Sequence, residues 1–434
     1  MGIEGLGSGG GRSFVLPRLR GVPSLGAHHL APVYIAAFGS LQVLILWTYR
    51  ERFGVLIPAL GLALLLLLVF VMLRVRDGWM AKVLLLGGLI AVTTFGPSII
   101  GMVQRQHAGL TFEVDGLAMD EVAIDRLMHG HAIYGVDWSG TQVDGYADFW
   151  GGVDLHDYPH FPLMPLSAIP IKVVTDALHA PFDYRMAVLL SSLIALAAIA
   201  LIPVALPARM AVAAAVFLNP SLSLMSWTGH DDIRYLALLL LGLALLGRRQ
   251  LLVATLAFGI AAALKPFALL VVPLLLVVIW YRSRSPRDAF RTGSVAAVTF
   301  SLPIVLSVGP FLLIDAGSFV HDVLTYLTTT LPISGFGLGG LLVALHVVSP
   351  NAHFSFAPLE IIALIPAYWF GLRAFARRMD LGQFLLSYCV ALFALFFFAR
   401  YFGDNYLAGL ISLVLCVPAL ISVGLGAPET RTVA

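Results

Sequence analysis

Ionisable side chains gather in a few short stretches of this 434-residue chain, between long apolar runs. The stretch 105–160 holds ten acidic residues and two basic ones, and most of these carboxylates are expected to be simply solvated. Asp115 differs because it follows an apolar run by about ten residues and directly precedes the amphipathic stretch 117–128. A carboxylate at such an apolar boundary is partly desolvated and suits the role of a general base.

A second set of charged residues lies at the ends of distant apolar runs. Its members are His230, Asp231, Asp232, Arg234, Lys265 and Arg400. Charges at membrane depth are costly and by default indicate a functional site. Helix capping by His230 and Asp231, an ion pair between Asp231 and Arg234, and snorkelling of the long side chains are the structural alternatives. Lys265 is the strongest functional candidate, because Lys265-Pro266 interrupts an otherwise continuous apolar stretch.

The amino-acid composition indicates that these residues are positioned by membrane-spanning helices. The chain is 59% hydrophobic and only 12% charged, about half the charged fraction of a soluble domain. Its apolar runs approach the roughly 20 residues that a membrane-spanning helix needs. They fall at 31–49, 54–75, 82–104, 185–205, 208–227, 232–247, 250–265, 266–281, 291–314, 357–374, 382–399 and 405–424. The sequence therefore predicts an all-α polytopic membrane protein with about 12–13 transmembrane helices.

The distribution of arginine and lysine predicts the orientation of the helices. The basic clusters around 74–82, 248–249, 282–291 and 373–378 fall on one side if the N-terminus is cytoplasmic. Twelve crossings then place the C-terminus in the cytoplasm too. The segment 161–180 is apolar but contains Pro162, Pro165, Pro170 and Lys172, so we expect it to be re-entrant or interfacial rather than a thirteenth crossing.

These boundaries divide the chain into three predicted parts. Residues 1–30 are expected to form a disordered cytoplasmic tail, 31–424 a single transmembrane domain, and 425–434 a second cytoplasmic tail. Within the domain, 105–160 is predicted to be an acidic extracytoplasmic loop and 315–356 a second extracytoplasmic segment, and the short turns 227–234 and 400–406 are predicted to lie on the same side. The apolar part of the latter, 336–348, is a candidate for lying along the membrane surface.

Several classes of function lack support in the sequence. The net charge of +2 gives no indication of a nucleic-acid partner. No Gly-x-x-x-x-Gly-Lys-Ser/Thr motif is present, which argues against ATP hydrolysis. His156 and His160 have i,i+4 spacing, but Pro159 and Pro162 argue against a helix that would bring both onto one zinc ion. One carboxylate base with cations at a lipid–water boundary instead suits transfer of a sugar from a lipid phosphate.

Three short motifs resemble the GT-C superfamily of polytopic glycosyltransferases, most closely the polyprenyl-phosphate-sugar-dependent transferases of the mannosyltransferase type (glycosyltransferase family 87-like). They are Asp115 followed by Gly130-His131-Ala132-Ile133-Tyr134-Gly135; Tyr158-Pro159-His160-Phe161-Pro162; and Trp227-Thr228-Gly229-His230-Asp231-Asp232 followed by Leu264-Lys265-Pro266-Phe267. The resemblance extends over residues 80–300. It differs from the minimal family pattern in having two helices ahead of the one that leads into the acidic loop.

The resemblance implies an inverting glycosyltransferase on the outer face of a bacterial cytoplasmic membrane. The donor would be a polyprenyl-phosphate sugar and the acceptor a glycan or glycolipid of the cell envelope, with no metal and no further cofactor. Asp115 matches the family's catalytic base, but Gly116 follows it where a second acidic residue often stands, so Asp120 and Glu121 remain alternatives. Tyr134, Tyr158 and His160 join the charged residues named above as candidates for binding the substrate.

Two other functions compete with this hypothesis. A transporter or flippase of lipid-linked saccharides would show repeat symmetry and charges near mid-membrane, whereas no internal repeat is visible and the candidate charges lie at the ends of apolar runs. A non-catalytic membrane protein of envelope assembly would tolerate substitution of Asp115.

Overall fold

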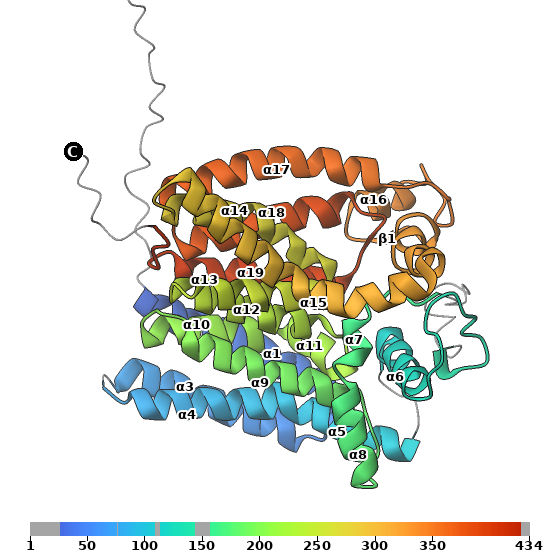
Figure 1. Ribbon diagram of the computed structural model, residues 1–434. Helices are drawn as coiled ribbons and strands as arrows, with labels where there is room; N and C mark the ends of the chain where they lie inside the picture. The colour runs from blue at the N-terminus through green and yellow to red at the C-terminus, as the bar shows by residue number, and fades with distance from the viewer. Residues whose placement is uncertain (1–26, 76, 109–112, 144–156, 427–434) are drawn as a thin grey trace, which may run out of the picture.

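The chain forms a bundle of helices that lie side by side, with shorter elements collected at one end (Figure 1). The computed structural model describes residues 27–75, 77–108, 113–143 and 157–426. Every predicted apolar run is helical. The helices concerned are α1 (Ala27–Thr48), α3 (Leu56–Arg74), α4 (Trp79–Ile90), η1 (Ala91–Phe95), α5 (Gly96–Ala108), α9 (Arg185–Leu201), α10 (Leu206–Phe217), α11 (Pro220–Thr228), α12 (Asp232–Gly247), α13 (Leu251–Leu264), η3 (Pro266–Val271), α14 (Val272–Arg282), α15 (Pro286–Val320), α17 (Ala357–Arg378), α18 (Leu381–Phe398) and α19 (Asp404–Leu420).

Shorter elements complete the fold, most of them at the end of the bundle to which α6 belongs (Figure 1). They are α2 (Arg50–Phe53), α6 (Asp115–Met128), α7 (Leu163–Leu166), α8 (Ile169–Ala177), the π-helix η4 (His321–Thr330), α16 (Leu338–Ala344), and the two-residue strands β1 (Ser334–Gly335) and β2 (Tyr401–Phe402). The two strands pair in parallel, with Ser334 opposite Tyr401. This pairing ties the predicted second outer segment to the turn before α19.

Helix α12 is the centre of the bundle. Twelve of its 16 residues are buried, and it packs between α9 and α13. The outer helices α3, α15 and α17 instead expose large apolar side chains, such as Leu66, Leu313 and Ile365. Apolar surface of this extent suits lipid far better than water. The arrangement is that of an all-α, membrane-associated protein.

The structure contains fewer helices that could span a membrane than the sequence predicts, when each helix is judged by its length and its composition. Among the described residues six helices are long and apolar enough to cross a membrane, or seven if the bent pair α10–α11 is one span. That pair meets at 53°, at Asn219–Pro220, where proline lacks an N–H and favours an extended residue before it. The helices α9, α13, η3–α14 and α19 are apolar but shorter. The runs that correspond to α9 and α19 extend four residues beyond the helices, and the runs 250–265 and 266–281 contain only 16 residues each.

The segment 161–180 does not form a spanning helix. It folds into α7, of four residues, and α8, of nine, whereas a crossing needs roughly 20 residues. Val173, Val174 and Leu178 are exposed on and just after α8. This agrees with the prediction of an interfacial or re-entrant segment.

The folded domain extends a few residues into both predicted tails. Helix α1 begins at Ala27, so the last four residues of the predicted N-terminal tail are helical, and residues 1–26 and 427–434 lie outside the described chain. Leu425 is buried, and its N–H donates to the carbonyl of Met379 at 2.6 Å, so it belongs to the folded domain. Arg282 donates to the carbonyl of Leu425, which places this basic residue beside the last described residues of the chain.

Candidate functional site

Five segments that are far apart in the sequence meet at the end of the bundle that carries α6. They enclose a cavity of about 100 Å³. Its polar lining comprises Asp115, His160, His230, Asp231, Lys265, Tyr326, Tyr401, Asn405 and Tyr406. All four stretches predicted to share one side of the membrane contribute to this lining: 105–160, 227–234, 315–356 and 400–406.

Asp115 is the first residue of α6 and lines the cavity. Its Oδ1 accepts the N–H of Gly116 at 2.8 Å. The preceding residue, Val114, donates its N–H to the carbonyl of Thr228 at 3.1 Å, which joins the start of α6 to the turn before α12. The carboxylate is therefore held at the cavity by backbone contacts on both sides of it.

Asp120 lies on the same helix but is fully buried behind the cavity wall. Its Oδ1 accepts a hydrogen bond of 2.5 Å from the Tyr158 hydroxyl and lies 3.0 Å from Nδ1 of His160. Tyr134 supports this arrangement by donating its hydroxyl to the carbonyl of His160 at 2.7 Å. Tyr134 and Tyr158 are thus residues that position His160 and Asp120, and neither lines the cavity.

The environment shifts the pKa values of these groups. Burial lowers the pKa of His160, but the adjacent Asp120 carboxylate outweighs it, and the net pKa rises to about 9. Burial and then the charge of Asp120 raise the pKa of the Tyr158 hydroxyl well above its usual range. Tyr158 is therefore a permanent hydrogen-bond donor to Asp120.

Glu121 does not reach the cavity. Its two carboxylate oxygens accept from the Arg105 guanidinium at 2.7 and 2.6 Å, and one of them also accepts the N–H of Tyr184 at 2.9 Å. A carboxylate with so many donors is occupied in holding α6 against α5 and α9. Of the three candidate bases, Asp115 is the one whose side chain lines the cavity.

Lys265 lies at the cavity between α13 and η3, in an extended conformation favoured by the following proline. Its Nζ lies 2.7 Å from Oδ1 of Asp231 and 2.8 Å from Oδ1 of Asp232. The other oxygen of Asp232 accepts from Nδ2 of Asn405 at 2.8 Å. Burial raises the pKa of Asp231, but the charge of Lys265 outweighs it and the net pKa falls to about 2.

The turn before α12 brings His230 to the cavity. Gly229 has a φ of +95°, in the left-handed region, and its position is packed closely against Leu117 of α6. His230 Nδ1 lies 2.9 Å from the hydroxyl of Thr228. Asp231 does not form the predicted alternative pair with Arg234, since its cation is Lys265.

The two predicted arginines are not at the polar cavity. Arg234 is buried beneath α7, where it donates to the carbonyl of Met164 at 2.9 Å, to the hydroxyl of Ser167 at 2.5 Å and to the hydroxyl of Tyr184. Arg400 is also buried, and it donates to the carbonyls of Leu331 and Phe354. Both arginines hold loops in place in this structure. Sequence position alone could not separate them from Lys265, because all three lie at the ends of apolar runs.

An apolar groove of about 190 Å³ adjoins the polar cavity. His160, Lys265, Tyr401 and Tyr406 line both spaces, while Phe161, Phe267, Leu324, Leu395 and Phe396 line the groove alone. Arg400 borders the groove as well. Polar groups that can hold a charged head group are therefore continuous with a surface that can hold a hydrocarbon chain.

Four polar lining residues were not among the predicted ones: Tyr326, Tyr401, Asn405 and Tyr406. The stretch 400–406 was recognised as an outer turn, but only its arginine was selected, because charge was the criterion. Nothing in the sequence around Tyr326 indicates a site. The i,i+4 spacing of His156 and His160, which the neighbouring prolines argue against as a helical zinc site, cannot be compared, since His156 lies outside the described residues.

Comparisons of the chain with protein-family models, with curated proteins and with solved structures find no match. The resemblance to GT-C glycosyltransferases thus depends on the three motifs of the sequence. The structure adds where those motifs lie: each of them contributes a residue to the wall of the same cavity, namely Asp115, His160 and Lys265.

Proposed function

We propose that this protein is an inverting glycosyltransferase of the GT-C type, which transfers a sugar from a polyprenyl-phosphate donor to an envelope glycan or glycolipid. One observation carries the proposal. Asp115, a carboxylate suited to be the base, and Lys265, a buried cation, line one cavity that continues into an apolar groove. A polyprenyl-phosphate sugar needs a cation for its phosphate, a polar cavity with a base for the reacting sugar, and an apolar surface for its isoprenoid chain. These three environments lie side by side here.

In the proposed reaction Asp115 accepts the proton of the acceptor hydroxyl. The hydroxyl oxygen attacks the anomeric carbon of the donor, while the bond from that carbon to the phosphate oxygen breaks. The polyprenyl phosphate leaves with the electron pair of that bond, and the proton stays on Asp115 until solvent removes it. Attack from the face opposite the leaving phosphate inverts the configuration. Lys265 stabilises the charge that develops on the leaving phosphate.

Lys265 can bind the phosphate only if one of the N–H donors of its ammonium group is not used within the protein. An ammonium group has three donors, and the carboxylates of Asp231 and Asp232 take two. The third is available to a phosphate oxygen in the cavity that Lys265 lines. In this proposal Arg234 and Arg400, buried against carbonyl and hydroxyl oxygens, contribute to the fold rather than to the phosphate.

The test is transfer of a radiolabelled sugar from a panel of polyprenyl-phosphate sugars, in membranes with matched amounts of each variant. Asp115→Asn removes the base while keeping the size of the side chain, and we expect the rate to fall by about 10²- to 10⁴-fold. Asp125→Asn is the matched control, because Asp125 lies on the same helix but is exposed and ion-paired only with His129. It should transfer at the wild-type rate.

Each other outcome has a defined meaning. Equal transfer by wild type and Asp115→Asn would remove Asp115 as the base. Absence of transfer by wild type, together with movement of lipid-linked saccharide between the two membrane leaflets, would replace the proposal with the flippase hypothesis. Tolerance of Asp115→Asn in cells that require the protein would favour a non-catalytic role in envelope assembly.

A further inference from the structure

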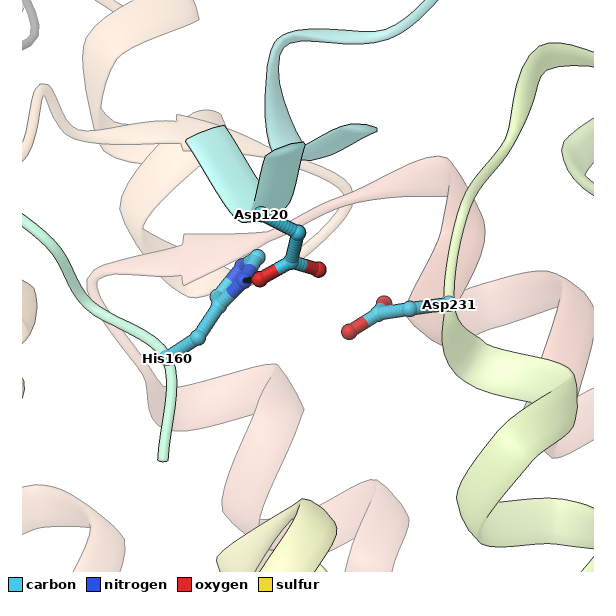
Figure 2. Close-up of side chains that lie close together, drawn as sticks. All are labelled: Asp120, His160 and Asp231. Carbon is cyan, nitrogen blue, oxygen red and sulfur yellow. Dashed lines mark hydrogen bonds and ion pairs between the residues drawn. The ribbon is translucent and has the colours of Figure 1, made fainter. Parts of the chain in front are cut away.

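Three ligand-type side chains from distant parts of the chain converge behind the polar cavity. They are Asp120 of α6, His160 of the loop before α7, and Asp231 of the turn before α12, and we refer to them as the Asp–His cluster. One potential ligand atom from each lies within 4.8 Å of the other two. Figure 2 shows the carboxylates of Asp120 and Asp231 facing one another, with the imidazole of His160 beside Asp120.

Two buried oxygen atoms of this cluster lack a hydrogen-bond partner among the described residues. Asp120 Oδ2 is one, although its residue has no exposed surface, and Asp231 Oδ2 is the other, in a residue that is 7% exposed. In both residues the other oxygen has a partner: Oδ1 of Asp120 has Tyr158 and His160, and Oδ1 of Asp231 has Lys265. Leaving a buried carboxylate oxygen without a donor is unfavourable, so two such atoms together point to a missing cation.

The surrounding charges favour the same conclusion. Four carboxylates meet here, since Asp115 and Asp232 adjoin the Asp–His cluster, and the basic groups that line the described cavity are Lys265, His160 and His230. The carboxylates therefore outnumber the basic groups even when both histidines are counted. A divalent cation would offset this excess of negative charge and would make the cavity more receptive to an anion.

We infer that the Asp–His cluster binds one divalent transition-metal cation, of the Mn²⁺ or Zn²⁺ kind, through Asp120 Oδ2, Asp231 Oδ2 and a nitrogen of His160. One imidazole and two carboxylates form a mixed nitrogen–oxygen ligand set that these ions accept. Ligands about 2.1 Å from a common ion lie at most about 4.2 Å apart, so the observed cluster needs to contract by less than about 1 Å. Two of the three proposed ligands, His160 and Asp231, also form part of the cavity wall.

The sequence predicts no metal at this site, and the reason is visible in the structure. The ligands come from positions 120, 160 and 231, so no local spacing indicates them. The only spacing considered, His156 with His160, contains one of the three. Binding of the ion is independent of the proposed sugar transfer and is measured without any substrate.

The experiment uses the full chain, purified in detergent, stripped with a chelator and titrated with Mn²⁺ while free Mn²⁺ is followed by electron paramagnetic resonance. Wild type should bind one Mn²⁺ per chain. Asp120→Asn and Asp231→Asn should each weaken binding by roughly 10- to 100-fold or more. Asp125→Asn is the control on α6, and His321→Ala is the control in the second acidic–histidine group, Asp157–His321–Asp322. Both controls should bind as wild type does.

A second measurement does not depend on whether the variants fold. Pulsed electron paramagnetic resonance of Mn²⁺ on the wild-type protein should show coupling to one imidazole nitrogen, and His321→Ala should retain it. Absence of stoichiometric binding by wild type would overturn the inference. So would binding without nitrogen coupling, loss of binding in His321→Ala, or unchanged binding in folded Asp120→Asn and Asp231→Asn.

Discussion

Two groups of charged side chains meet α6 at the neighbouring residues Asp120 and Glu121, and they differ in how completely they are paired. The first, which we refer to as the arginine network, joins Arg105 and Arg185 to three carboxylates, Glu113, Glu121 and Asp183. None of its described nitrogen or oxygen atoms is buried without a partner. The Asp–His cluster has two such atoms.

This difference separates a structural role from a functional one. Both groups are equally removed from water, so burial alone does not distinguish them. A network whose donors and acceptors match fixes neighbouring segments in place, whereas a group with unused acceptors retains the capacity to bind something else. Substitutions in the arginine network should therefore affect folding first, and substitutions near the Asp–His cluster should have smaller effects on stability.

The largest effect on stability is expected for Arg185→Met. Arg185 is fully buried and donates to Asp183 at 2.7 and 2.9 Å, so its removal leaves the buried Asp183 carboxylate with only the longer contact of 3.4 Å to Arg105 among its charged partners in the described chain. We expect the free energy of unfolding in mixed micelles to fall by about 3–5 kcal/mol. Lys172→Met, which breaks the exposed Lys172–Asp176 pair, is the control and should cost less than about 1 kcal/mol. Similar losses for the two variants would contradict the structural role of the network.

The next effect is expected for Gly229→Ala, in the turn that carries Asp231. The φ of +95° costs alanine about 1–2 kcal/mol, and its Cβ would lie 2.3 Å from the buried side chain of Leu117, which adds about 1–3 kcal/mol. Gly130→Ala is the matched control, because φ is +73° there but no atom lies within 4 Å of the added Cβ. Thermal unfolding of both variants measures the contribution of the contact. Equal losses would mean that α6 does not pack tightly on this turn.

A smaller effect is expected for Tyr158→Phe, which deletes the hydroxyl that donates to Asp120. A hydrogen bond to a charged group contributes about 1.5–3 kcal/mol, and His160 remains to hold the carboxylate. The same unfolding measurement applies, with Tyr281→Phe as the control at an exposed position of α14. No loss of stability in Tyr158→Phe would show that Asp120 does not depend on this donor, and the two groups would then be more alike than the structure indicates.

The amino-acid sequence by itself determined the class of fold and the end of the molecule where the site lies. Long apolar runs have only the helix as a way to satisfy their backbone in lipid, so each run could be placed. The alternation of basic clusters with acidic stretches assigned loops to two ends, and the structure brings the four predicted stretches to one cavity. Asp115 and Lys265 were selected from their positions at apolar boundaries, and both line it.

Only the tertiary structure shows which charged side chains bind other parts of the protein and which face the cavity. Arg234, Arg400 and Lys265 look alike in the sequence, but the partners of the arginines are carbonyl and hydroxyl oxygens contributed by loops 46 to 70 residues away. Asp120 and Glu121 are neighbours on α6, yet one meets His160 and the other Arg105. Pairing of buried charges depends on contacts between distant segments, and residue type and local spacing do not contain that information.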